Sequence, residues 1–226
     1  MSLFLCYNFY GDSMNVEDSL LKNFNLIINE ISDKIFGCET EFQIELILLF
    51  RKLFPNCIVR AEYPYKKKKI DILIITQDGK WVPIELKYKK KGCKILNNGL
   101  EIKLENDGAQ TDNVYYFLKD IERIEHIKQN NADKFLKGYV IFLTNDSSYW
   151  KNVYKPVPDI NEKYSYSLLG KEIFIPDTSI YRNKKLKIVE RHLIKWHNFN
   201  NVMEENIIEG NNEKCSIFRY LIAEIQ

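Results

Sequence analysis

The 226-residue sequence has few cysteines and lacks the paired spacings that cysteines show in redox motifs. Its five cysteines are scattered, odd in number and contain no Cys-x-x-Cys. This usage is typical of a reducing compartment, so we expect a cytoplasmic protein. The apolar residues 1–10 lack the basic residues that begin a signal peptide, and no apolar run is long enough to cross a bilayer. We therefore expect no membrane partner.

Motifs for nucleotide hydrolysis, histidine–metal chemistry and triad hydrolysis are also lacking. The Gly-Lys pairs at residues 79–80 and 170–171 have neither the upstream glycine nor the following Ser or Thr of a phosphate-binding loop. A strand would place His192 and His197 on opposite faces, because their spacing is odd. No Ser-His-Asp or Cys-His arrangement stands out. These absences argue against nucleotide-driven work and against a histidine metal site.

The composition is that of an ordinary globular protein. Apolar residues make up 45% and charged residues 28%, with a net charge of +2 and a pI of about 8.1. Such a molecule is not a polybasic nucleic-acid coat. At this length we expect one compact domain, residues 38–226, with an N-terminal helical segment, residues 1–37, packed on its core.

The stretch with the clearest pattern is a predicted β-hairpin. Two runs rich in β-branched residues, 70–76 and 81–88, flank a short segment that contains an Asp-Gly pair. An Asp-Gly pair between two such runs is the strongest short-range hairpin signal, so we expect two antiparallel neighbouring strands. Side chains alternate between the faces of a strand, so Glu85 and Lys87 share one face.

The hairpin also brings a second carboxylate to this face. Asp71 lies near the start of the first strand, and antiparallel pairing returns the second strand past it, within reach of Glu85. Two carboxylates held together are costly unless a cation lies between them, and hard oxygen ligands select Mg²⁺ or Mn²⁺. Such an ion polarises a phosphoryl oxygen and helps to generate a hydroxide nucleophile. Lys87 would orient the water or offset charge on the phosphate.

Asp71, followed after the turn by Glu85-Leu86-Lys87, resembles the D…(D/E)-x-K motif of the PD-(D/E)XK, or restriction-endonuclease-like, nuclease superfamily. Ile70 replaces the proline that gives the motif its name. The resemblance implies an α/β fold, a restriction-endonuclease-like mixed β-sheet flanked by helices. It also implies an endonuclease that hydrolyses phosphodiester bonds with Mg²⁺ (or Mn²⁺). Asp71, Glu85 and the carbonyl of Leu86 would be metal ligands, and Lys87 the catalytic lysine.

The resemblance further implies a nucleic-acid partner, with DNA expected before RNA, and a homodimer by analogy with enzymes that cut both strands. Restriction, defence, repair and toxin roles all fit the same residues, because function cannot be read from fold alone. One alternative is a non-catalytic module on the same fold that binds nucleic acid or another protein. Another is a solvated edge hairpin with ordinary surface charges.

Lysines crowd the hairpin, because residues 66–94 contain ten lysines and only three carboxylates. Such a patch attracts a phosphate backbone in a salt-dependent way. The candidate nucleic-acid-binding residues are Lys66, Lys67, Lys68, Lys69, Lys89, Lys90 and Lys91. The alternative is a solvated rim without a ligand, since the whole chain is rich in Lys, Asn and Ile.

Apolar residues at helical spacing predict an amphipathic helix over residues 15–36 and a second over 40–54, opened by a Thr-x-x-Gln capping box. Members of the superfamily place a glutamate on the helix before the catalytic hairpin. Glu39, Glu41 and Glu45 can each be aligned with that position. We favour Glu41 and Glu45 as catalytic candidates, because Glu39 precedes the expected cap. Alternatively, both are exposed charges on the helix face.

After the hairpin, an Asn-Gly turn predicts a second small hairpin over residues 95–102, and helical periodicity predicts a helix over 109–127. Gln110 with Tyr115 is similar to the Gln-x-x-x-Tyr pair of some superfamily members, although the spacing differs by one residue. Gln110 is therefore a candidate accessory residue. The unbroken apolar run 138–144 predicts a central strand buried on both faces.

The rest of the chain has weaker patterns. A strand is predicted over residues 57–63, before the lysine run. Residues 149–179 are rich in tyrosine and proline and predict a long loop with one short strand at 172–175. Alternating patterns at 192–197 and 216–225 predict closing strands.

Overall fold

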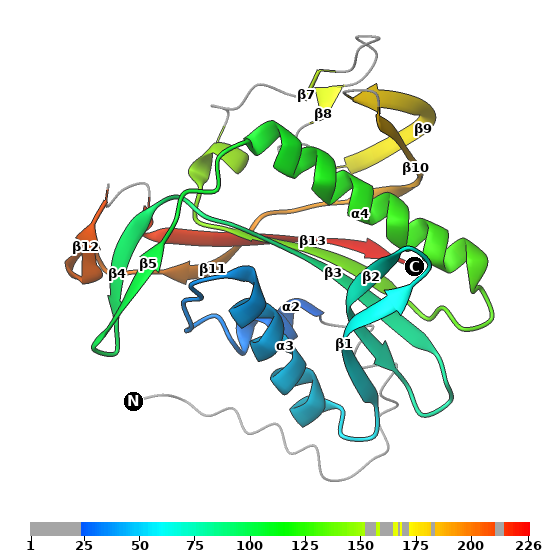
Figure 1. The fold of residues 1–226 in the computed structure, drawn as a ribbon, viewed down its shortest axis with the longest axis horizontal. Coiled ribbons are helices and arrows are strands. Elements are labelled where there is room, and N and C mark those ends of the chain that lie inside the picture. Colours follow the sequence, from blue (N-terminus) through cyan, green and yellow to red (C-terminus); the bar gives the residue numbers. More distant parts are fainter. Residues whose placement is uncertain are drawn as a thin grey trace.

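The computed structural model describes residues 24–151, 157–158, 165–166, 168, 172–181, 184–210 and 215–226. The chain is an α/β protein in which a mixed sheet carries α3 on one face and α4 on the other (Figure 1). Its helices are α2 (Phe24–Asn29), α3 (Glu39–Leu53) and α4 (Gln110–Asn130), with short 3-10 turns η1 (Ser147–Tyr149) and η2 (Glu204–Asn206). No helix in the described ranges is both long and apolar enough to cross a membrane.

The main sheet has six strands in the order β1-β2-β3-β6-β13-β11. They are β1 (Ile58–Tyr65), β2 (Lys68–Ile75), β3 (Trp81–Lys89), β6 (Gly138–Thr144), β13 (Ile217–Ile225) and β11 (His197–Asn201). Among the described strands of this sheet, β3 and β6 are the one parallel pair, and α4 lies in the connection between them, as a parallel crossover requires. A three-stranded sheet has the order β12 (Ile207–Glu209), β4 (Cys93–Asn97), β5 (Leu100–Leu104). Two further sheets have two strands each: β9 (Glu172–Tyr181) pairs with β10 (Lys184–Leu193), and β7 (Val157–Pro158) pairs with β8 (Ser165–Tyr166).

The predicted hairpin is present as β2 and β3, with Ile72 opposite Ile84 and Ile75 opposite Trp81. Its turn contains Gly79 at φ 82°, a left-handed conformation that glycine adopts without strain. β1 pairs with the outer side of β2, and β6 pairs with the other side of β3. Both hairpin strands are therefore interior strands, and the solvated edge hairpin is not what forms.

Alternation along these strands divides the core into two halves. Ile84 and Leu86 point to the α3 side, where they pack with Phe42, whereas Leu73 points to the α4 side and packs with Ile121. Each half buries one helix face against the sheet, and this apolar burial is the main contribution to the stability of the layers. Side chains of β3 that alternate with Leu86 consequently lie beneath α4.

β6 is the predicted central strand, and all seven of its residues are buried. Gly138 begins this strand where α4 approaches closely. A Cβ built at Gly138 would lie 2.3 Å from Ile124 Cγ2 and 3.1 Å from Phe135 Cζ. A side chain there would force Ile124 of α4 to move, so glycine at this position permits the close approach of the helix.

Two helix predictions are wrong in part. The first helix ends at Asn29 rather than at residue 36, and the predicted residues 15–23 lie outside the described part of the chain. α3 begins at Glu39 with Cys38 as its N-cap and without a side-chain capping bond. Thr40 is thus already inside the helix, so the predicted capping box does not form. Gln43 instead donates a hydrogen bond to the carbonyl oxygen of Asp71.

The C-terminal strands also differ from the prediction. β9 continues to Tyr181, well past the expected short strand at residues 172–175, and pairs with β10. β10 ends at Leu193, so residues 192–197 are the end of one strand and the start of β11 rather than a strand of their own. The predicted strand over 216–225 is present as β13.

Candidate active site

The sheet brings Asp71, Glu85 and Lys87 together on the side that α4 covers. Asp71 lies one residue before the Ile72–Ile84 pair, and its Oδ2 accepts a hydrogen bond from the N–H of Leu86 at 2.7 Å. Glu85 and Lys87 flank Leu86 on β3, so their side chains point to the opposite face from Leu86. The three candidates of the motif therefore share one location.

Two side chains of α4 complete this cluster. Asp120 Oδ2 lies 2.8 Å from Lys87 Nζ, and Asp120 Oδ1 lies 3.3 Å from Arg123 Nη2. Arg123 Nη2 also forms a close ion pair with Glu85 Oε2. Asp120 and Arg123 are three positions apart, so they project from the same side of the helix. We call these five residues, Asp71, Glu85, Lys87, Asp120 and Arg123, the charged cluster.

The sequence pattern assigns neither Asp120 nor Arg123 a role. Their one signal is position, because both lie within the apolar stripe of the predicted helix, beside Ile121 and Ile124. A charged side chain that falls on the buried face of an amphipathic helix needs a partner across the interface. That rule could have marked both residues, but it could not have named Glu85 and Lys87 as their partners.

The charged cluster is largely shielded from solvent, so an unpaired charge in it is costly. Glu85 is fully buried, and the exposed fractions of the Lys87, Asp120 and Arg123 side chains are 19%, 11% and 19%. Among the described residues, Glu85 Oε1 has no hydrogen-bond partner. With Asp71 included, three carboxylates face two cationic side chains, so the ionised cluster carries one uncompensated negative charge. Such an excess is costly in a buried site and favours binding of a further cation.

The pKa values follow from this burial. Burial raises the pKa of Asp71, although the hydrogen bond from Leu86 and the charge of Lys87 oppose it. Burial likewise raises the pKa of Asp120, to about 6, against the attraction of Lys87. Burial lowers the pKa of Lys87. The nearby carboxylates, Asp120 first among them, raise it by more, so the net pKa is raised. Lys87 is therefore a protonated cation at neutral pH, unsuited to act as a base.

α3 holds both strands of the hairpin next to the cluster. Glu39 Oε2 accepts a hydrogen bond from the N–H of Tyr88 at 2.6 Å, and its charge raises the pKa of Lys87. Gln43, one helical turn later, donates from Nε2 to the carbonyl oxygen of Asp71 at 2.7 Å. Of the three candidate glutamates, Glu39 is the one that contacts β3.

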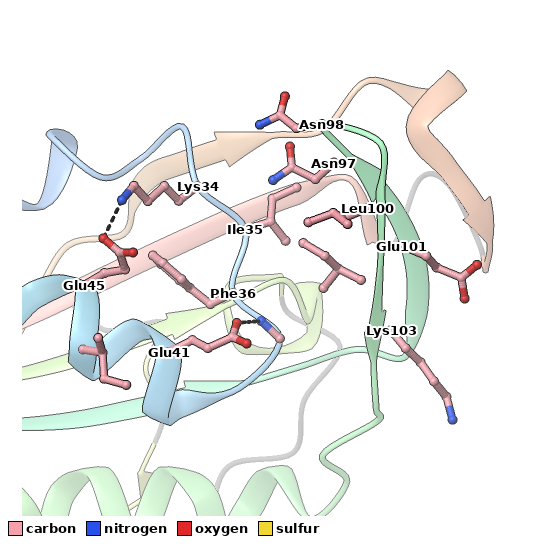
Figure 2. A pocket seen from close by; sticks show the side chains of 13 residues that line it. Lys34, Ile35, Phe36, Glu41, Glu45, Asn97, Asn98, Leu100, Glu101 and Lys103 are labelled. Atoms are coloured by element: carbon pink, nitrogen blue, oxygen red, sulfur yellow. Dashed lines mark hydrogen bonds and ion pairs between the residues drawn. The ribbon is translucent and has the colours of Figure 1, made fainter.

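The favoured candidates Glu41 and Glu45 are not brought to the cluster. Glu41 Oε2 accepts a hydrogen bond from the N–H of Gly37 at 2.6 Å, and Glu45 Oε2 pairs with Lys34 Nζ at 2.5 Å (Figure 2). The reason is helical phase. Positions 39 and 43 face the hairpin, and a residue two positions further on is turned by about 200°.

Glu41 and Glu45 instead line a separate cleft of about 570 Å³ between α3 and the β4–β5 hairpin (Figure 2). Ile44 and Leu100 also line it, so the walls mix apolar and charged side chains. No member of the charged cluster lines this cleft. The cleft is therefore distinct from the charged cluster.

The candidate lysines fall into two groups. Lys66, Lys67, Lys68 and Lys69 are exposed at the β1–β2 turn and the start of β2. The second group, Lys89, Lys90 and Lys91, is half-buried. Lys90 Nζ in that group lies 3.6 Å from Asp107 Oδ2 and 5.6 Å from the centre of the Tyr88 ring.

Gln110 is not brought to the cluster either. It opens α4 and donates from Nε2 to Asp146 Oδ2 at 3.0 Å. Asp120 follows ten residues later on the same helix, about 15 Å further along its axis. Gln110 is therefore too far along the helix to contact Lys87 or Glu85 directly.

A second buried polar group joins α4 to β10. Ligand atoms of Glu125, Glu190 and His192 lie within 4.8 Å of one another. Each already has a protein partner, however. Glu125 Oε2 accepts a hydrogen bond from the N–H of Val189, its Oε1 lies 2.8 Å from His192 Nε2, and Glu190 pairs with Lys128 Nζ at 2.5 Å. We assign this group a structural role as a tether for β10.

The charged cluster contains oxygen atoms of the kind that small divalent cations prefer. The carboxylates of Asp71 and Glu85 and the carbonyl of Leu86 are hard oxygen donors, the kind that Mg²⁺ and Mn²⁺ prefer. Leu86 O accepts a hydrogen bond from Lys87 Nζ at 2.9 Å. Glu85 Oε1, which has no hydrogen-bond partner among the described residues, and the excess negative charge are compatible with a bound cation. At Oε2 of the same carboxylate, the guanidinium of Arg123 already supplies positive charge.

Comparisons with protein-family models, with curated proteins and with solved structures give no match to this chain.

Proposed function

We propose that the chain is a metal-dependent nuclease of the PD-(D/E)XK type, which hydrolyses phosphodiester bonds of nucleic acid, DNA before RNA. One observation carries the proposal: Asp71 and Lys87 lie on the same face of the hairpin as Glu85, which is fully buried and whose Oε1 has no hydrogen-bond partner among the described residues. The order of elements around the cluster supports it, since α3, β1, β2, β3, α4 and β6 follow the order expected of a restriction-endonuclease-like core.

In this proposal Asp71, Glu85 and the carbonyl of Leu86 hold Mg²⁺ or Mn²⁺. Such a cation supplies charge stabilisation at a phosphate oxygen and generation of a nucleophile from water. Lys87, protonated at neutral pH, donates hydrogen bonds that orient the attacking water or offset charge that develops on the phosphate. Asp120 fixes the ammonium of Lys87 through the 2.8 Å ion pair and is therefore a positioning residue.

A second candidate is a non-catalytic module that binds nucleic acid or another protein on the same fold. One observation favours it, because Arg123 pairs with Glu85 and Asp120 pairs with Lys87. The cluster is thereby partly neutralised by protein groups alone. Such a module would bind without any requirement for metal and without turnover.

Cleavage by the purified full chain separates the two candidates. Linear duplex, supercoiled and single-stranded DNA and a structured RNA are incubated with Mg²⁺, Mn²⁺ or EDTA. We expect metal-dependent cleavage that falls by at least about a hundredfold in Lys87→Ala, the usual loss when a group that stabilises transition-state charge is removed. Lys80→Ala, in the turn of the same hairpin, is the matched control and should cleave normally.

Two results would count against the nuclease. An undiminished rate in Lys87→Ala would remove Lys87 from the mechanism. No cleavage of any substrate, together with salt-sensitive binding, would favour the non-catalytic module. Thermal unfolding of both variants would show that each is folded, since neither side chain belongs to the apolar core.

A further inference from the structure

Two hairpins contact α4 next to the charged cluster. The β1–β2 hairpin arrives from one side, where the carbonyl of Lys69 accepts a hydrogen bond from Arg123 Nη1 at 3.0 Å. The β9–β10 hairpin arrives from the other side, where the carbonyl of Lys185 accepts a hydrogen bond from Lys119 Nζ at 3.0 Å. Figure 1 shows β9 and β10 alongside α4, with the β1–β2 turn at the same helix. Three segments distant in sequence thus form one surface.

Cationic side chains gather where these segments meet. The pKa of Lys119 is lowered mainly by burial. Repulsion from the nearby charge of Lys68 lowers it further. Lys184 Nζ lies 5.0 Å from the centre of the Tyr116 ring and donates to its hydroxyl at 2.9 Å. We call the group the α4 basic surface; its cations are Lys68, Lys69, Lys119, Arg123, Lys184 and Lys185.

Carboxylates neutralise only part of this surface. Glu62 lies 3.4 Å from Lys69, and Glu122 pairs closely with Lys119. Asp120, the third neighbouring carboxylate, is buried and directed at Lys87 and Arg123. With Glu85, which pairs with Arg123, six cations face four carboxylates, and of these only Glu62 is exposed. The outward field of the surface is positive, which attracts a polyanion.

Arg123 connects the surface to the site. Its Nη1 contacts the β1–β2 hairpin, and its Nη2 contacts Glu85 and Asp120 of the charged cluster. A single planar guanidinium thus spans from the exposed lysines to the buried carboxylates. Guanidinium groups bind phosphate in the same bidentate manner in which they bind carboxylate.

We propose that the α4 basic surface binds the phosphate backbone of nucleic acid and places it against the charged cluster. The inference rests on the proposed nuclease function for the nature of the partner. Tyr116, with 44% of its surface exposed, adds an aromatic ring of the kind on which an unpaired base stacks. Lys90, which is paired with Asp107 at the other end of β3, is not counted in this surface.

The test is binding without turnover, measured by fluorescence anisotropy of the full chain in EDTA. Labelled single-stranded DNA, duplex DNA and RNA are titrated between about 50 and about 200 mM salt. Lys68→Gln and Lys185→Gln should each weaken binding and lower the slope of log affinity against log salt by about one, as loss of one phosphate contact predicts. Lys52→Gln, exposed on α3 across the sheet, is the matched control and should keep the wild-type slope.

The outcomes separate this inference from the proposed activity. Wild-type slopes in both Lys68→Gln and Lys185→Gln, or no binding of any probe by the wild-type chain, would overturn the α4 basic surface. Reduced slopes without metal-dependent cleavage would support the surface and contradict the nuclease. Cleavage with unchanged slopes would support the nuclease and place its substrate elsewhere.

Discussion

At the residue scale, Arg123 supplies positive charge to Glu85, whose carboxylate is fully buried. In the proposed metal site a divalent cation would supply charge to the same group. Removing the guanidinium leaves Glu85 without its charge partner, and a buried carboxylate in that state gains more from a bound cation. In this proposal Arg123 would therefore compete with the metal for the same carboxylate.

We expect Arg123→Gln to bind Mn²⁺ about tenfold more tightly than the wild type, a difference of about 1.4 kcal/mol. The reason is the loss of a competing charge at Glu85 Oε2. Isothermal titration calorimetry measures the affinity, and Lys128→Gln, also on α4, is the control because Lys128 pairs with Glu190 instead. Equal or weaker affinity in Arg123→Gln would show that the guanidinium supports the site rather than competes for it.

Asp120 gives a prediction about pH. Its pKa is raised by burial to about 6, above the ordinary value of 3.8. The folded state thus holds this proton more tightly than the unfolded state, so the contribution of Asp120 is complete below about pH 4 and lost as pH rises through about 6. Relative to Asp120→Asn, the wild type should lose about 3 kcal/mol of unfolding free energy over that range.

Urea unfolding at a series of pH values in EDTA measures this difference. A difference that stays constant, or one that is lost as pH falls, would mean that Asp120 is not the buried acid described above. Added Mn²⁺ should reduce the pH dependence, because a cation in the cluster favours the ionised carboxylate.

The sequence made Asp71, Glu85 and Lys87 predictable because a short turn fixes how β2 and β3 face each other. Asp120 and Arg123 were not predictable as members, since their meeting with β3 depends on how α4 is rotated against the sheet. The preference for Glu41 over Glu39 failed for a similar reason. α3 begins one residue before Thr40, and that start sets which glutamate faces β3.

At the element scale, the turn residues were the sequence feature that best predicted the strands and their pairing. Asp-Gly and Asn-Gly pairs predicted both hairpins, because Gly79 and Gly99 adopt positive φ angles of 82° and 79°. β9 and β10 were largely missed. The amides of Lys187 and Val189 in β10 bond to Glu122 and Glu125 of α4 rather than to β9, so much of this strand is stabilised by a helix distant in sequence.

The contact between α4 and β6 supplies a second prediction at this scale. Gly138→Ala should destabilise the fold by about 1 to 3 kcal/mol, the usual cost of overpacking a core, because the new methyl group meets Ile124. Chemical denaturation measures the loss. Gly108→Ala is the control, since a Cβ there meets nothing within 4 Å and should change stability little. Equal stability of the two variants would mean that α4 moves freely against the sheet.

At the scale of the whole molecule, the α/β layering places a buried negative site beneath a positive outer surface. The alternating pattern of β2 and β3 and the continuous apolar run of β6 made the mixed sheet predictable. The α4 basic surface was not, because it joins residues near positions 68, 119 and 185 that only the packing of two hairpins on one helix brings together. The lysine-rich run in the sequence pointed to two of its six cations, Lys68 and Lys69.

The central claim is that Asp71 and Glu85 form a binding site for a divalent cation. Calorimetric titration of Mn²⁺ into the full chain tests it most directly, with Asp71→Asn compared against Asp78→Asn, an exposed aspartate in the turn of the same hairpin. We predict binding by the wild type and by Asp78→Asn, and a loss of at least about tenfold in Asp71→Asn. A wild-type chain that binds no Mn²⁺, or an Asp71→Asn variant that binds it equally well, would contradict the claim.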